Sequence, residues 1–281
     1  MSGEAEGSPF TLDGPFFLIA GPCVLEDSSL NLRVARRLRR ASERLGLPVY
    51  FKASFDKANR SSLEAARGPG LAAGIELLKA VREESGLPVL TDVHLPAQVE
   101  SLAGIVDALQ VPAFLSRQTD LLVAVGGSGL PVNIKKGQWM APEQIVHSVE
   151  KVRSAGAQAV SVTERGVAFG YGRWVVDMRS FSIMRDVAGC PAVFDATHSV
   201  QLPGAQGRHS GGEPQFIPAL AGAAVAAGAD GLFLEVHPVP EQAPSDSASM
   251  LPLDLLEPLL ERILAIRQAL GHLDERGRGA R

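Results

Sequence analysis

The sequence alternates short apolar runs with longer amphipathic segments, and it does so eight times. Each run is continuously apolar, which is typical of parallel strands that are covered on both faces. Eight repeats of a strand followed by a helix predict an α/β fold, a single-domain (β/α)8 barrel, and 281 residues suit that fold. A doubly wound open sheet is the alternative, but it gives no reason for eight units. The predicted strands are Phe16–Gly21, Val49–Ser54, Val89–Val93, Ala108–Val111, Val132–Lys136, Val160–Arg165, Ala192–His198 and Leu232–His237.

Glycines mark the turns from helix to strand. The tetrapeptide GLPV lies at this turn in three units, where it begins at Gly46, Gly86 and Gly129. Glycine just beyond a helix end adopts the left-handed backbone of a C-cap, and a following proline stops the helix. Single glycines hold the same place in three other units: Gly156, Gly189 and Gly228. The turns from strand to helix are much longer, so we expect the functional residues at that end of the barrel. The longest are Ser54–Pro69, Thr163–Arg179, Ser199–Pro214 and Pro238–Leu251.

Composition and the chain ends favour a globular cytoplasmic protein over a nucleic-acid-binding, membrane or secreted one. We expect the barrel over residues 14–272, with a flexible N-terminal segment at 1–13 and a flexible C-terminal tail at 273–281. A net charge of −4 argues against nucleic-acid binding, and no apolar run is long enough to span a membrane. The first residues lack the basic start and apolar stretch of a signal peptide. Two cysteines, Cys23 and Cys190, form no disulfide framework, so we expect a cytoplasmic protein.

Cationic side chains gather at the C-terminal ends of the predicted strands or just beyond them, at the end of the barrel with the long turns. The strand ends of a closed barrel surround one mouth, and pooling positive charge there is costly unless anions bind. Phosphate and carboxylate are the natural partners of arginine and lysine. The alternative is that long side chains merely extend from the strand ends into water. The cations are Lys52, Lys57, Arg60, Arg117, Lys135 and Arg165.

A second set of side chains suggests a metal site. Cys23, His198, Glu235 and Asp246 lie at the C-terminal ends of the first, seventh and eighth strands or just beyond them, and these strands are neighbours in a closed barrel. Thiolate, imidazole and carboxylate together suit one divalent transition metal of the Zn, Fe or Mn class. The alternatives are that Cys23 is a small buried hydrophobic residue and that His198 is a hydrogen-bonded core histidine.

Six motifs resemble the 3-deoxy-D-manno-octulosonate 8-phosphate synthase family, and the likeness runs from about residue 14 to 270. The resemblance implies a barrel that joins phosphoenolpyruvate to arabinose 5-phosphate and releases phosphate. The product of that family feeds the inner core of lipopolysaccharide. The motifs are FKASFDKANRSS (Phe51–Ser62), PAFLSRQTDL (Pro112–Leu121), VNIKKGQ (Val132–Gln138), TERGVAFGY (Thr163–Tyr171), VFDATHSVQLPG (Val193–Gly204) and LEVHPVPEQAPSD (Leu234–Asp246).

The same resemblance implies roles for individual residues. Phosphoenolpyruvate would be held by Lys57, Lys135 and Arg165, with Lys52 close beside it. The aldose phosphate would be held by Asn59, Arg60 and Ser61. Family members are homotetramers in which Arg117 would reach a neighbouring subunit's site. The residues expected to take part in catalysis are Lys57, Lys135, Arg165, His198 and Asp246.

The family has metal-dependent and metal-independent branches, and this chain is similar to the first. Metal-dependent members carry cysteine after the first strand, where the others carry asparagine, and here that position is Cys23 in AGPC. The resemblance makes His198, Glu235 and Asp246 the other ligands, and KKGQ in place of KKPQ agrees with this branch. One departure is Leu95, where an acidic residue is expected after His94.

Three other functions remain open at this point. The related heptulosonate 7-phosphate synthases use erythrose 4-phosphate, but they usually carry a Pro-Arg-Thr-Ser sequence where this chain has Asn59–Ser62. A Schiff-base aldolase could use Lys52, Lys135 or Lys136 as its nucleophile. A non-catalytic barrel could bind sugar phosphate or metal, although such a protein needs no site for two substrates.

Overall fold

The computed structural model describes residues 8–59, 64–168, 172–206 and 209–278. Eight parallel strands of this part of the chain form a closed ring, because β1 pairs with β2 on one side and with β12 on the other. This closure confirms the single-domain TIM barrel and excludes the open sheet. The strands of the ring are β1 (Phe17–Val24), β2 (Val49–Ser54), β3 (Val89–Asp92), β4 (Ala108–Val111), β5 (Val132–Lys135), β6 (Val160–Glu164), β9 (Ala192–Asp195) and β12 (Gly231–His237).

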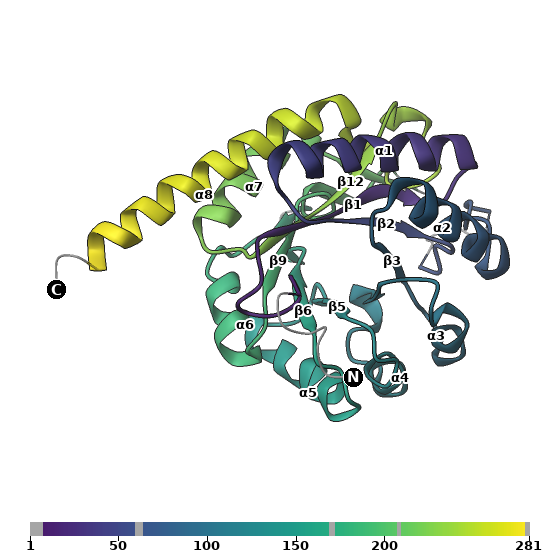
Figure 1. Ribbon diagram of the computed structural model, residues 1–281, viewed down its shortest axis with the longest axis horizontal. Helices are drawn as coiled ribbons and strands as arrows, with labels where there is room; N and C mark the ends of the chain where they lie inside the picture. Colours follow the sequence, from purple (N-terminus) through teal and green to yellow (C-terminus); the bar gives the residue numbers. More distant parts are fainter. Residues whose placement is uncertain (1–7, 60–63, 169–171, 207–208, 279–281) are drawn as a thin grey trace.

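Helices surround this ring on the outside, as Figure 1 shows in a view along the barrel. Two small hairpins lie in the long turns: β7 (Val167–Ala168) with β8 (Trp174–Val175), and β10 (Gln201–Gln206) with β11 (His209–Gly212). The short strand β13 (Leu251–Pro252) extends the pairing of β12. The helices are α1 (Ser28–Leu45), α2 (Leu71–Ser85), α3 (Pro96–Leu102), α4 (Thr119–Gly126), α5 (Val146–Ser154), α6 (Ser180–Ala188), α7 (Ile217–Ala226) and α8 (Leu256–Arg278).

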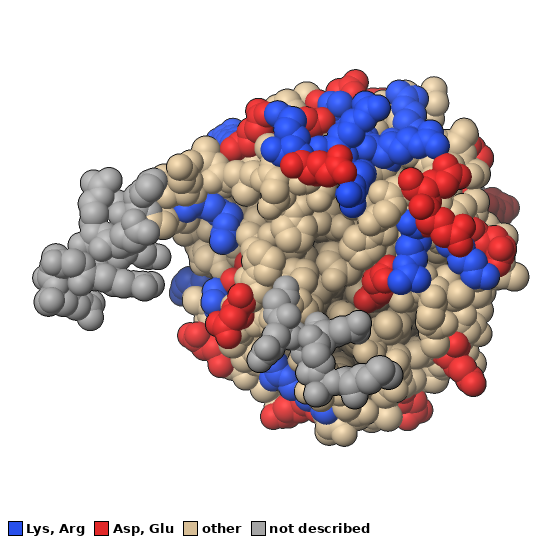
Figure 2. Space-filling view, viewed as in Figure 1, with Lys and Arg blue, Asp and Glu red and all other residues tan. Residues whose placement is uncertain are grey.

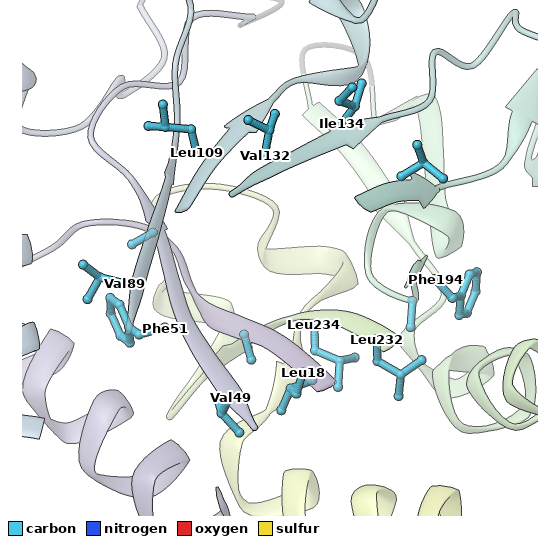
Figure 3. Packing of buried hydrophobic residues seen from close by; sticks show 14 of the residues in the cluster. Leu18, Val49, Phe51, Val89, Leu109, Val132, Ile134, Phe194, Leu232 and Leu234 are labelled. Carbon is cyan, nitrogen blue, oxygen red and sulfur yellow. The ribbon is translucent and has the colours of Figure 1, made fainter. Parts of the chain in front are cut away.

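Alternate residues of each strand face two different cores. Figure 3 shows Leu18, Val49 and Leu232 on the side of the strands that faces the helices, where they join the larger core. Their neighbours Phe17 and Phe233 belong to the smaller core inside the barrel. Because a strand alternates its side chains, a parallel strand between two cores is buried on both faces and is mostly apolar, with buried polar residues such as Lys52 and Asn133 on the side of the barrel interior. This explains the continuous apolar runs.

Three of the six predicted glycine caps are confirmed as the residues that end a helix. Gly46, Gly86 and Gly189 end α1, α2 and α6 in the left-handed region, with φ of 62°, 65° and 57°. The turns before β5, β6 and β12 also contain glycines with positive φ: Gly129, Gly156 and Gly228.

Described structure extends beyond both predicted boundaries of the barrel domain, residues 14 and 272. Phe10, which was expected in a flexible segment, is buried and its ring lies 5.2 Å from those of Phe17 and Tyr50. Residues 8–13 therefore cover the end of the barrel where the strands begin. At the other end α8 continues to Arg278, beyond residue 272, and Figure 1 shows it extending away from the barrel.

The outer face of α1 is rich in arginine and is matched by carboxylates of neighbouring helices. Arg36 pairs with Glu84 of α2, while Arg37 and Arg44 pair with Glu257 of α8. Figure 2 shows these mixed charges gathered over α1 at the top of the view. No helix within the described residues is long and apolar enough to cross a membrane.

The contact between Tyr50 and the N-terminal segment gives a testable pH dependence. Burial raises the pKa of Tyr50 to about 12, and the carboxylate of Asp107 adds to the shift. An unfolded tyrosine has a pKa of about 10. Between these values the folded chain keeps a proton that the unfolded chain has lost, so the stability contributed by Tyr50 falls as the pH rises. We expect Tyr50→Phe to lose less thermal stability than the wild type when the pH is raised from 8 to 11. Equal losses in the two proteins would contradict this.

Candidate active site

The chemistry-bearing side chains lie at the ends of the strands, as the long turns predicted. The backbone of β1 passes very close to β2 at Gly21. A Cβ at this position would lie only 1.9 Å from the carbonyl oxygen of Lys52, so no larger residue fits. The pairing register shifts between Ala20 and Cys23, just after this close approach. Cys23 then takes a φ of 73°, and Asp246 has a φ of 52°. They are the only non-glycine residues with positive φ in the described chain. Such conformations are costly and cluster at functional sites.

Three of the four predicted metal ligands meet in one cluster. The ligand atoms of Cys23, Glu235 and Asp246 all lie within 4.8 Å of one another. The thiol of Cys23 lies 3.1 Å from Oδ2 of Asp246. His198 borders this cluster, since its Nε2 lies 3.8 Å from Oε1 of Glu235. His198 lies in the short 3-10 helix η3 (His198–Val200), which directly follows β9, and not in the strand itself.

The electrostatics of this cluster fit a cation. Neither carboxylate oxygen of the buried Glu235 has a hydrogen-bond partner among the described residues. A buried carboxylate without donors is costly unless a positive charge compensates it. Burial raises the pKa of the Cys23 thiol well above its usual range, and Glu235 raises it further. A divalent cation would stabilise the thiolate and satisfy Glu235 at once, so the donor set suits a transition metal.

Two lysines from β2 and the turn after it face this cluster. Lys52 is almost fully buried and donates to the carbonyl oxygen of Cys23 at 3.3 Å, and its Nζ lies 3.3 Å from Oδ1 of Asp92. Lys57 lies 3.7 Å from Glu235 and 3.9 Å from Asp246. Burial opposes the charge on Lys57, but Cys23, Glu235 and Asp246 outweigh it and raise the pKa of Lys57. Lys57 therefore remains protonated and offers a fixed positive charge.

Lys135 and His198 share the carboxylate of Asp195. Lys135 donates to Oδ2 of Asp195 at 2.7 Å, and the Nδ1 of His198 lies 2.8 Å from the same oxygen. Burial alone would raise the pKa of Asp195, but His198 and Lys135 lower it well below its usual range. An ionised Asp195 only accepts hydrogen bonds, so Nδ1 of His198 carries the proton and Nε2 is left to face Glu235. Burial lowers the pKa of Lys135, and Asp195 opposes this shift.

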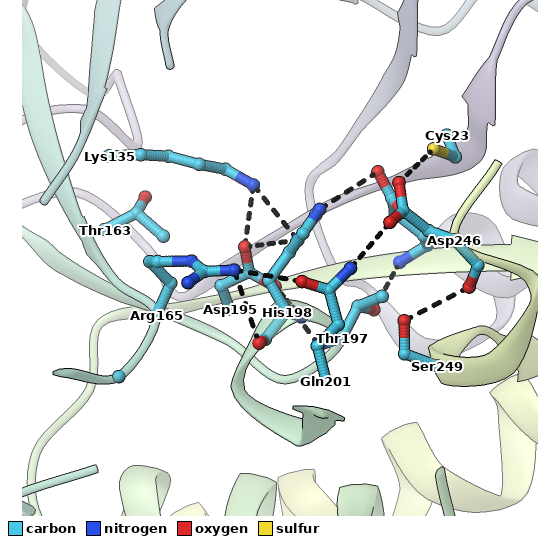
Figure 4. A network of polar contacts seen from close by, with 12 residues as sticks. Cys23, Lys135, Thr163, Arg165, Asp195, Thr197, His198, Gln201, Asp246 and Ser249 are labelled. Atoms are coloured by element: carbon cyan, nitrogen blue, oxygen red, sulfur yellow. Dashed lines mark hydrogen bonds and ion pairs between the residues drawn. The ribbon is translucent and has the colours of Figure 1, made fainter. Parts of the chain in front are cut away.

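Arg165, at the end of β6, joins Lys57 and Lys135 in a group of cationic side chains, which we call the anion-binding wall. Its guanidinium lies 4.7 Å over the ring of Trp174, and one nitrogen, Nη2, donates to Gln201 at 3.1 Å (Figure 4). The other, Nη1, is buried and has no hydrogen-bond partner within the described residues. A buried cationic donor is left unsatisfied unless it finds an acceptor, and the oxygens of a phosphate or carboxylate bind it most strongly. The site therefore joins an anion-binding wall to a candidate metal centre.

The remaining predicted residues are not part of this cluster in the described chain. Asn59 is exposed in the turn after β2, while Arg60 and Ser61 lie outside the described residues. Arg117 is exposed in the turn that follows the 3-10 helix η1 (Ala113–Leu115), and no contact joins its side chain to the cluster. Lys136 is fully buried and donates to the carbonyl oxygen of Met140 at 3.0 Å, so it has a structural role.

Some site residues escaped the sequence analysis. Asp92 and Asp195 lie at strand ends, and no role was assigned to them from the sequence. A carboxylate at the end of one strand could have been predicted to pair with a lysine at the end of another. Gln201 gave no such signal, because an amide in a glycine-rich turn resembles any polar loop residue. Its part in the site depends on a partner 45 positions away.

Comparisons with known proteins agree with this architecture. The DAHP synthetase I family matches residues 10–269. Curated relatives named 2-dehydro-3-deoxyphosphooctonate aldolase are similar over nearly the whole chain. The protein of Syntrophotalea carbinolica is 55% identical over 252 residues, which cover 90% of this chain and 91% of its own. That of Alkalilimnicola ehrlichii is 53% identical over 268 residues, 95% of each chain. These relatives confirm the predicted resemblance, and the chain belongs to the DAHP synthetase I family.

Proposed function

We propose that this protein condenses phosphoenolpyruvate with D-arabinose 5-phosphate and water to give 3-deoxy-D-manno-octulosonate 8-phosphate and phosphate. The observation that carries the proposal is the anion-binding wall beside the cluster of a thiol and carboxylates. The chain is also about half identical to proteins named 2-dehydro-3-deoxyphosphooctonate aldolase. That name denotes the same condensation. The use of this reaction for lipopolysaccharide precursors and a cytoplasmic location are parts of the same proposal.

We assign the phosphoenolpyruvate site to Lys57, Lys135 and Arg165, with Lys52 beside them. The free Nη1 of Arg165 supports this assignment, because it would donate to a phosphate or carboxylate oxygen. Asn59, Arg60 and Ser61 are assigned to the phosphate of the aldose. Two phosphates and one carboxylate then have enough cationic partners at one mouth.

In the reaction, C3 of phosphoenolpyruvate forms a bond to the aldehyde carbon while water adds at C2. The C–O bond of the resulting hemiketal phosphate then breaks, which leaves a ketone and releases phosphate. Negative charge grows on the aldehyde oxygen and on the departing phosphate. Lys57, Lys135 and Arg165 are held in place by neighbouring groups before the reaction, so they stabilise this charge without reorganising. Fixing both substrates at one mouth also supplies orientation, which is worth about 7–11 kcal/mol in well-aligned systems.

We assign one divalent metal of the Zn, Fe or Mn class to Cys23, His198, Glu235 and Asp246. Such an ion supplies Lewis-acid chemistry, either on a substrate oxygen or on a water molecule. His198 and Asp246 count as catalytic for this reason. Asp195 orients His198 through Nδ1, and a carboxylate behind a histidine ligand is the usual arrangement of metal sites.

Arg117 is assigned to a neighbouring subunit's site in a homotetramer. Its exposed position in one chain supports this, since a long cationic side chain there is free to reach across an interface. The other assignments need only the residues of a single chain.

The test of the proposed function is phosphate release from phosphoenolpyruvate with either arabinose 5-phosphate or erythrose 4-phosphate. We expect turnover with the five-carbon aldose only. Preference for erythrose 4-phosphate would assign the chain to heptulosonate synthesis. Borohydride treatment in the presence of substrate should trap no covalent adduct, because the Nζ of Lys135 is bound to Oδ2 of Asp195 at 2.7 Å and is not available as a free amine. Release of phosphate with neither aldose, by folded protein supplied with divalent metal, would refute the proposed function.

A further inference from the structure

Gln201 lies between the anion-binding wall and the candidate metal centre. Its Oε1 accepts a hydrogen bond from Nη2 of Arg165 at 3.1 Å, and its Nε2 donates to Oδ1 of Asp246 at 2.6 Å. Gln201 begins the hairpin β10–β11, and its side chain is buried. Figure 4 shows the amide between the guanidinium and the carboxylate, so that one side chain contacts both parts of the site.

The chemistry of the two partners fixes the orientation of this amide. A guanidinium can only donate hydrogen bonds, and an ionised carboxylate can only accept them. The Nε2 of Gln201 lies 2.6 Å from Oδ1 of Asp246 while its Oε1 faces Arg165, so an amide rotated by half a turn would lose both bonds. Each partner thus holds Gln201 in the orientation that the other needs.

This arrangement decides which atoms of the partners remain available. Because Nη2 of Arg165 is bound to Gln201 and to the backbone carbonyl oxygen of His198, at 3.1 Å and 3.4 Å, Nη1 is the nitrogen that lacks a partner among the described residues and is left for an anion. Because Oδ1 of Asp246 is bound to Gln201, Oδ2 is the oxygen that faces Cys23 and Lys57, at 3.1 Å and 3.9 Å. Gln201 therefore sets the orientation of a cationic donor and of a candidate ligand at once.

We propose that Gln201 is a positioning residue that couples binding of the phosphate-bearing substrate at Arg165 to binding of the divalent metal at Asp246. The inference rests on the proposed function for the identity of the two ligands. A shift of the Arg165 guanidinium towards an anion changes its bond to Oε1, and the rigid amide carries this change to Asp246. Binding of either ligand then alters the affinity for the other by the same factor, as linkage requires.

The test uses two substitutions of Gln201 and one matched control in the full-length protein. Gln201→Met keeps the length of the side chain and removes both bonds, while Gln201→Asn keeps the amide but is too short to reach both partners. Gln158→Met makes the same exchange at an exposed glutamine before β6, at the opposite end of the barrel. Zn²⁺ affinity is measured by competition with a chromogenic chelator, and phosphoenolpyruvate affinity by calorimetry. Thermal melting checks that each variant is folded.

We expect both Gln201 variants to bind Zn²⁺ and phosphoenolpyruvate about tenfold more weakly, since residues that orient metal ligands change affinity by roughly 10–100-fold. The control should remain within twofold of the wild type for both ligands. Two results would overturn the inference: a folded Gln201→Met protein with both affinities unchanged, or a loss of one affinity alone.

These affinities require no turnover, so they separate this inference from the proposed function. A wild-type protein without condensation activity, whose two affinities nevertheless fall together in the variants, would overturn the proposed reaction and support the role of Gln201. A wild-type protein that binds neither Zn²⁺ nor phosphoenolpyruvate would overturn both.

Discussion

Removal of divalent metal by a strong chelator is expected to lower the condensation rate by about 100- to 1000-fold, and addition of a divalent metal should restore it. Lewis-acid stabilisation of developing charge is worth several kcal/mol, and each 1.36 kcal/mol corresponds to about a factor of ten in rate. The structural reason is the cluster of Cys23, Glu235 and Asp246, where a buried carboxylate has no hydrogen-bond donor of its own. The measurement is phosphate release before chelation, after chelation and after metal is returned.

Substitution of Cys23 separates loss of the metal from other effects of chelation. Cys23→Ser should lose bound metal and activity together, because a serine hydroxyl is a far weaker ligand for these ions than a thiolate. Cys190→Ser is the matched control. Cys190 is equally buried, but it lies at the start of β9 beyond the helix cap Gly189, and burial raises its pKa to about 12. A Cys23→Ser protein with full metal content and full activity would show that the ligand assignment is wrong.

Cys23→Asn tests the choice of branch. The resemblance implies asparagine at this position in metal-independent members of the family. We therefore expect this variant to lose metal and to keep part of its turnover, unlike Cys23→Ser. The measurement is the turnover of both variants after chelation. If the two variants were equally inactive, the expected metal-independent turnover of Cys23→Asn would be wrong.

The barrel could be predicted because its strands lie between two cores. A strand such as Val49–Ser54 is buried on both faces and therefore mostly apolar, and glycines before most strands adopt a left-handed backbone, so both features can be recognised in the local sequence. The hairpin β7–β8 gave no such signal, because strands of two residues are too short for any periodicity. The burial of Phe10 could not be predicted for another reason. It depends on the rings of Phe17 and Tyr50, while the residues next to Phe10 in the sequence are polar.

The site was predictable to the extent that its residues carry charge. Lysines and carboxylates at strand ends can be located from the order of strands, because a closed barrel brings those ends together. The pairing of particular partners could not be derived this way. These contacts depend on side-chain directions that only the folded chain defines. Examples are the contact of Lys135 with Asp195 and that of Gln201 with Asp246.

Replacement of Arg165 by methionine is expected to lower kcat/KM for phosphoenolpyruvate by about 100- to 1000-fold, the range found when one preorganised donor to a developing charge is removed. Burial lowers the pKa of Arg165 from its usual value, and Asp195 and Asp246 oppose this shift, so the guanidinium stays charged. Lysine should not restore the activity, because one ammonium cannot both donate to Gln201 and present a second donor at the position of Nη1.

Arg82→Met is the control for this substitution. Arg82 lies in the last turn of α2 and pairs with Asp107 at 2.6 Å on the surface, where an ion pair contributes at most about 1 kcal/mol. Its removal should leave kcat/KM unchanged. Thermal melting checks that Arg165→Met is folded, since the change also removes a positive charge that faces Asp195 and Asp246. If Arg165→Met and Arg82→Met had the same kcat/KM, the unpartnered nitrogen would not be the substrate's binding group, and the anion site would have to be sought around Lys52 and Lys57.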